Sequence, residues 1–82
     1  MDLPEQAGAM LLDATGLRCP LPVLRARKRL VALAPGAVLD VLADDPAAEG
    51  DMRAFCQAAG HRLLAVSEAA PGVSRFRIAR GP

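Results

Sequence analysis

Residues 16–30 read GLRCPLPVLRARKRL, with one cysteine and two prolines directly before a basic run of helical character. The apolar residues 10–14 precede this stretch and end in a Thr-Gly pair, which predicts a strand that enters a turn. From Pro20 to about Ala34, apolar residues recur at helical spacing, and a Pro-Gly pair follows. The expected apolar face of this helix comprises Val23, Leu24, Leu30, Val31, Leu33 and Ala34. The stretch therefore predicts a strand–turn–helix unit.

A second helix is expected in the middle of the chain. Asp45 is a suitable N-cap, and Pro46 suits the first helical position. The helix is expected to run to Ala59, where Gly60 ends it. Its apolar residues have the i, i+3, i+4, i+7 spacing of one helix face and are Met52, Phe55, Cys56 and Ala59.

Three further strands are expected, at residues 37–43, 61–69 and 73–80, with a turn at residues 70–72. In the last strand Phe76 and Ile78 alternate with arginines, so one face of the sheet is expected to be wet. The order βαβαββ with short connections predicts an α+β two-layer sandwich, in which two helices pack on one face of a four-stranded mixed sheet.

The composition bounds the class of protein. The chain has 82 residues and a net charge of +1, with no Trp or Tyr and only two Phe. One small domain is expected at residues 10–82, after a flexible leader at residues 1–9. The near-zero net charge and the scarcity of aromatic rings argue against a general nucleic-acid binder. Without a signal-peptide pattern or a long apolar run, we expect a cytoplasmic protein that does not enter a membrane.

The two cysteines differ in their surroundings. Cys56 lies on the apolar stripe of the second helix, which favours a buried, structural thiol. Cys19 precedes Pro20, which favours extended geometry and predicts that Cys19 is the N-cap of the first helix. At that position the helix dipole and the charge of Arg18 are expected to lower the pKa of the thiol and make it a nucleophile.

The two prolines fit the start of a helix. Pro20 and Pro22 fall where backbone N–H groups have no partner within the helix, so they cost no hydrogen bond and stiffen the segment that holds the thiol. Leu21 also precedes a proline, which predicts a distorted first turn. An alternative remains, in which Cys19 is merely a small residue in a proline-rich turn.

Several thiol chemistries lack the residues they need. A thioredoxin-type exchange uses C-x-x-C, whereas the position three after Cys19 is Pro22. The one histidine, His61, begins a different strand, so a Cys–His pair has no support and a structural His61 is favoured. Two cysteines and one histidine show no zinc spacing, and no metal or cofactor is expected. What remains is a lone nucleophile that accepts a group and passes it on.

The segment LDATGLRCPLPVLRARKRL, with LADDP, FC and GHRL further on, resembles the TusA/SirA-like sulfur carrier (sulfurtransferase) family over residues 11–80. The resemblance implies a βαβαββ sandwich in which Cys19 carries a persulfide. A cysteine desulfurase would donate the sulfur, and a downstream relay protein would accept it, most often for 2-thiouridine synthesis in tRNA. Other branches of the family supply molybdenum cofactor maturation or sulfur oxidation.

The resemblance also implies roles for the residues around Cys19. Pro20 and Pro22 would mount the thiol together with Leu21, and Asp45 would cap the second helix. Partner proteins would dock on a surface that comprises Arg18, Arg25, Arg27, Lys28, Arg29 and Asp45. The acidic residues 44–51 form either a second docking patch or an ordinary solvated helix start. A monomer that does not bind nucleic acid directly is expected.

Three rival classes stay open at this point. An arginine-rich first helix also suits a regulatory or nucleic-acid-binding module. A thiol redox protein would form a Cys19–Cys56 disulfide. A non-catalytic structural subunit would not need Cys19 for sulfur transfer.

Overall fold

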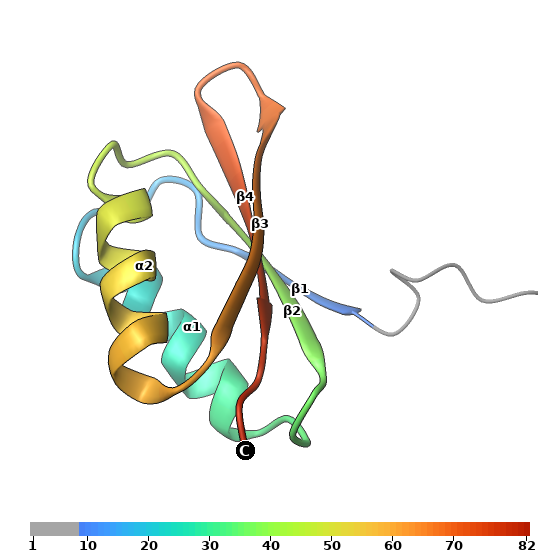
Figure 1. Cartoon of the computed structure of the whole chain (residues 1–82). Helices are drawn as coiled ribbons and strands as arrows, with labels where there is room; N and C mark the ends of the chain where they lie inside the picture. Colours follow the sequence, from blue (N-terminus) through green and yellow to red (C-terminus); the bar gives the residue numbers. More distant parts are fainter. Residues whose placement is uncertain (1–8) are drawn as a thin grey trace, which may run out of the picture.

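The computed structural model describes residues 9–82, which form a sheet with two helices packed on one of its faces (Figure 1). The elements in chain order are β1 (Ala9–Asp13), α1 (Leu21–Val31), β2 (Val38–Ala43), α2 (Ala48–Ala59), β3 (Arg62–Ala70) and β4 (Val73–Ala79). The strand order across the sheet is β1-β2-β4-β3. β1 and β2 are parallel, and the other two pairs are antiparallel. The predicted mixed, two-layer βαβαββ fold is confirmed.

The core lies between the sheet and the helix layer. In the central strands Leu39 lies opposite Ile78, and Val41 lies opposite Phe76, and all four side chains are fully buried. Successive strand residues point to opposite faces, so these pairs share the face that meets the helices. The helices contribute small and medium-sized buried side chains, namely Ala26, Leu30, Ala48, Met52 and Cys56. Without Trp or Tyr, the core depends on close packing of aliphatic chains around one phenylalanine.

The predicted core face of the first helix was partly wrong. α1 ends at Val31 rather than at Ala34, and its buried residues are Pro22, Ala26 and Leu30, one every four residues. Leu24 and Val31, both expected inside, are 47% and 63% exposed. The small Ala26 lets the helix approach the sheet closely, and this places larger neighbours on the outside. Apolar spacing alone does not distinguish the buried stripe, Pro22, Ala26 and Leu30, from the exposed apolar residues Leu24 and Val31.

The predicted cap of the second helix was also wrong. α2 begins at Ala48 with Ala47 at its N-cap, and no side chain caps it. Asp45 lies two residues earlier, where its Oδ1 accepts a hydrogen bond of 3.1 Å from the Ala47 N–H. Gly60 ends the helix as predicted, in the left-handed conformation that glycine adopts readily.

The C-terminal residues pack against the ends of the helices. The Gly81 N–H donates a hydrogen bond of 2.9 Å to His61 Nδ1, and the His61 ring lies 5.4 Å from the Phe55 ring. The guanidinium of Arg80 donates to the Leu30 carbonyl at 2.8 Å. A methyl group on Gly81 would overlap the Gly60 carbonyl. These contacts give His61 a structural role, as expected.

The predicted leader falls on residues 1–8, which lie outside the described residues, and on Ala9, which already belongs to β1. Neither helix in residues 9–82 has the length and apolar character needed to cross a membrane.

Candidate functional site

The loops that follow β1 and β2 leave the sheet at the same end, because these strands are parallel neighbours. Two aspartates of the β2–α2 loop hold the β1–α1 loop in place. The Gly16 N–H donates to Asp44 Oδ1 at 3.0 Å, and the Cys19 N–H donates to Asp45 Oδ2 at 2.6 Å. The backbone of Cys19 is therefore anchored to a segment 26 residues away in the chain.

The β1–α1 loop also has its own local bonds. Asp13 Oδ1 accepts hydrogen bonds from the Thr15 N–H at 3.0 Å and the Thr15 hydroxyl at 2.6 Å, an Asx-type turn. Gly16 follows with φ +82, where a side chain would be strained. The Cys19–Pro20 peptide bond is cis. This arrangement presents Cys19 on the surface, immediately before α1.

The N-cap of α1 is Pro20, so the prediction that Cys19 caps the helix was wrong by one residue. Leu21 and Pro22 follow in the first turn, where N–H groups have no helical partner, and Pro22 is fully buried. Both prolines thus begin the helix without loss of a backbone hydrogen bond. Because Cys19 lies outside the helix, its thiol gains less from the helix dipole than an N-cap side chain would.

The electrostatic surroundings of the thiol are acidic. Interaction with the Asp51 carboxylate is the main cause that raises the pKa of the Cys19 thiol. Desolvation and the negative charges of Asp51 and Asp45 act in the same direction. The predicted lowering of the pKa was therefore wrong. Arg18, expected to assist it, has its guanidinium 3.8 Å from Asp44 instead.

Asp45 stays ionised under ordinary conditions. Hydrogen bonds from the backbone N–H groups of Ala47 and Cys19 lower the pKa of its carboxyl group. Asp45 was predicted from the sequence as a helix cap and a docking residue, and its role as an anchor for Cys19 was not predicted. Asp51 was noted only as part of an acidic segment, and its position on α2 facing the thiol had no signal in the local sequence.

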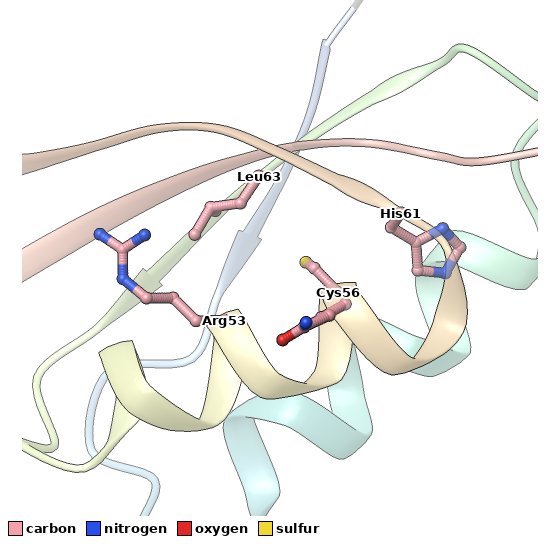
Figure 2. A pocket seen from close by; sticks show the side chains of 5 residues that line it. Arg53, Cys56, His61 and Leu63 are labelled. Atoms are coloured by element: carbon pink, nitrogen blue, oxygen red, sulfur yellow. The ribbon is translucent and has the colours of Figure 1, made fainter.

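The second thiol is buried. Cys56 is 3% exposed, and burial raises the pKa of its thiol. A cavity of about 360 Å³ between α2 and β3 is lined by Arg53, Cys56, Gln57, His61 and Leu63. The Cys56 sulfur points from α2 toward the sheet (Figure 2). Both cysteines are free thiols, which disfavours the redox alternative with its Cys19–Cys56 disulfide.

The remaining predicted site residues lie along α1. Arg25, Arg27, Lys28 and Arg29 are all exposed. Leu21 and Leu24 are 43% and 47% exposed, so the first turns of α1 present apolar surface close behind Cys19 in the chain. Helical spacing alone predicts Leu24 in the core, so this apolar surface could not be predicted from the sequence pattern.

Among the described residues, the site lacks the side chains that a metal ion or a Cys–His pair would need. Among residues 9–82, no group of three His, Cys, Asp or Glu side chains is placed to hold a metal ion. The Nδ1 atom of His61 accepts the Gly81 N–H, and the groups around the Cys19 thiol are carboxylates. An exposed, anchored cysteine before the first helix of a βαβαββ sandwich is typical of a protein that carries a group on one thiol.

Comparisons with known proteins agree with this class. The family model described as "Sulfurtransferase TusA" matches residues 10–80, and the chain belongs to this family of sulfur carriers. A protein of Neisseria meningitidis serogroup A is 58% identical over 57 residues, which are 70% of this chain and 77% of the relative. The sulfur carrier protein TusA of Allochromatium vinosum is 49% identical over 57 residues, 70% of this chain and 75% of the relative.

A solved structure shares the fold. The crystal structure of a SirA-like protein from Desulfitobacterium hafniense has a TM-score of 0.79 and 31% sequence identity. The match covers 89% of this chain and 99% of that one. The resemblance seen in the sequence, to TusA/SirA-like sulfur carriers, is confirmed.

Proposed function

We propose that Cys19 carries sulfur as a persulfide between a cysteine desulfurase and an acceptor protein. The observation that supports this most is the contrast between the two thiols: Cys19 is exposed on an anchored loop, and Cys56 is buried. A carrier thiol must reach the active sites of two other proteins in turn. Membership of the TusA family supports the same role.

The transfer consists of two displacements at sulfur. The Cys19 thiolate attacks the terminal sulfur of the persulfide on the desulfurase, the donor S–S bond breaks, and its electron pair leaves on the donor cysteine. Cys19 then carries the extra sulfur through a new S–S bond. A thiolate of the acceptor attacks that terminal sulfur in turn, and Cys19 leaves as a thiolate. No external oxidant or reductant is needed.

The residues around Cys19 have supporting roles in this proposal. Asp45 anchors the Cys19 backbone, and Pro20 and Pro22 begin the helix that follows. The exposed Leu21 and the basic residues of α1, which are Arg25, Arg27, Lys28 and Arg29, give partner proteins a surface beside the thiol, and Arg18 adds to it. Partners that bind this surface would bring the thiol to their own reactive cysteine.

For the final acceptor, we propose a cytoplasmic relay that ends in 2-thiouridine of tRNA. The support is family resemblance, because the geometry of Cys19 suits any protein persulfide. Molybdenum cofactor maturation and sulfur oxidation would use the same chemistry at Cys19 with a different acceptor protein.

The test is the mass of the intact protein after incubation with a cysteine desulfurase, pyridoxal phosphate and free cysteine. Wild type and Cys56→Ser are expected to gain one sulfur atom that a reductant removes, and Cys19→Ser is expected to gain none. Sulfur on Cys56, or no gain in wild type, would overturn the proposal.

A further inference from the structure

A second concave surface lies along α1, on the side of the helix that faces β1. A cavity of about 490 Å³ is lined by Leu12 of β1, by Arg25, Lys28 and Arg29 of α1, and by Ala32, the C-cap residue of that helix. The four helix residues have the spacing i, i+3, i+4, i+7 and therefore form one stripe. We name this surface the α1–β1 groove. It combines an apolar floor, Leu12 and Ala32, with three cationic side chains.

The positive charge of the groove is not compensated by the described part of the protein. The ion pairs within residues 9–82 are Arg18–Asp44, Arg53–Glu49 and Arg77–Asp40, and none involves a groove residue. Three cations on one stripe repel one another, which costs free energy in the unoccupied groove. An anionic occupant would relieve this repulsion.

The groove runs beside an open edge of the sheet. β1 is an outer strand with an unbroken register against β2, and no other strand of residues 9–82 pairs with it. The opposite outer strand, β3, has two register shifts, a feature that discourages pairing with another chain. β1 has no such irregularity, and its Leu11 is 58% exposed on the face away from the helices.

We propose that the α1–β1 groove binds an acidic, extended segment of a partner protein, which adds as a strand to the outer edge of β1. Alternate side chains of that strand would point to opposite faces of the sheet. Carboxylates on the helix side would meet Arg25, Lys28 and Arg29, and apolar side chains on the other side would cover Leu11. The inference builds on the proposed function, since the partner would be a protein of the sulfur relay.

The lining favours a peptide over a nucleic acid. Two of the five lining residues are apolar, and backbone pairing at an open strand edge is a mode of peptide recognition. Single-stranded nucleic acids bind proteins largely through stacking on aromatic rings. Phe76 is buried, and Phe55 is partly buried against His61 and the core, so the aromatic rings lie away from the groove.

The test uses a peptide of alternating Val and Glu, a matched Val-Lys peptide and a single-stranded oligouridine, each titrated into the ¹⁵N-labelled protein. The Val-Glu peptide is expected to shift the amide signals of Met10–Asp13 and of the groove residues of α1. Arg29→Glu should weaken its binding by about fivefold or more. Arg62→Glu, an equal change of charge at an exposed arginine of β3 outside the groove lining, should change binding less than twofold.

Several results would overturn the proposal: no shifts along β1, equal losses in Arg29→Glu and Arg62→Glu, equal binding of the Val-Lys peptide, or binding of oligouridine alone. The Cys19→Ser protein separates this inference from the proposed function. It should bind the Val-Glu peptide as wild type does while it fails to gain sulfur. Peptide binding without sulfur loading in wild type would refute the relay, and loading without peptide binding would refute the groove.

Discussion

The neighbours of Cys19 raise the pKa of its thiol in the free protein and so favour the protonated form. Asp51 is the main cause of this shift, and the negative charge of Asp45 also opposes loss of the proton. Since the thiolate is the nucleophile, this environment lowers the reactivity of the thiol in the isolated carrier. A partner that brings positive charge to Asp51 would remove this restraint, so reactivity would arise at the moment of docking.

The role of Asp51 can be measured from the pH dependence of alkylation. Asp51→Asn removes the negative charge and the anionic hydrogen-bond acceptor, so the pKa of Cys19 should fall. The midpoint of the iodoacetamide rate against pH should therefore move to lower pH, and reaction at neutral pH should become faster. Glu49→Gln is the control, because Glu49 pairs with Arg53 on the same helix. An unchanged midpoint in Asp51→Asn would show that Asp51 does not govern the thiol.

Asp45 links the β1–α1 loop to the β2–α2 loop. Its carboxylate accepts N–H groups from Cys19 at 2.6 Å and from Ala47 at 3.1 Å. Asp45→Ala should release the Cys19 amide and make its hydrogen exchange faster, with the change confined to the two loops. Asp44→Ala is the matched variant and should instead expose the Gly16 amide. Equal protection of Cys19 in wild type and Asp45→Ala would contradict the anchoring role.

The contact of α1 with the sheet depends on a small residue. Ala26 is fully buried, so Ala26→Leu would force extra atoms into a packed core and should lower the free energy of unfolding by about 1–3 kcal/mol. Ala32→Leu, at the exposed C-cap of the same helix, should change it by less than about 0.5 kcal/mol. Urea unfolding measures both. Similar stability of the two variants would show that Pro22, Ala26 and Leu30 are not the packed stripe.

For the whole molecule, the sequence predicts the fold better than it predicts the site. The order of elements follows from apolar runs and from Pro-Gly punctuation, which are local signals. The site depends on contacts between distant residues, such as Cys19 with Asp45, and no local pattern encodes them. For that reason the predicted direction of the pKa shift at Cys19 was wrong. From the local sequence, only the helix dipole and Arg18 were expected to act on the pKa of Cys19. In the folded chain Asp51 acts on it most strongly and raises it.

The contact between His61 and Gly81, which are far apart in the sequence, makes the stability of the protein depend on pH. Burial, with a contribution from the charge of Arg80, lowers the pKa of His61, and its Nδ1 can accept the Gly81 N–H only when that nitrogen is unprotonated. Because the folded state disfavours the protonated ring, the stabilisation is fully present above the unfolded value of about 6.5. It is lost progressively as the pH falls below that value and through the lower pKa of the folded state.

His61 is the only histidine in the chain, so a comparison with His61→Gln isolates this effect. Wild type should lose stability in urea between about pH 7 and pH 5, since Asp and Glu titrate mainly at lower pH. His61→Gln should be less stable than wild type at pH 7 and change little over the same interval. Parallel curves for the two proteins would mean that the bond between His61 and Gly81 does not hold the C-terminal residues against the helix layer.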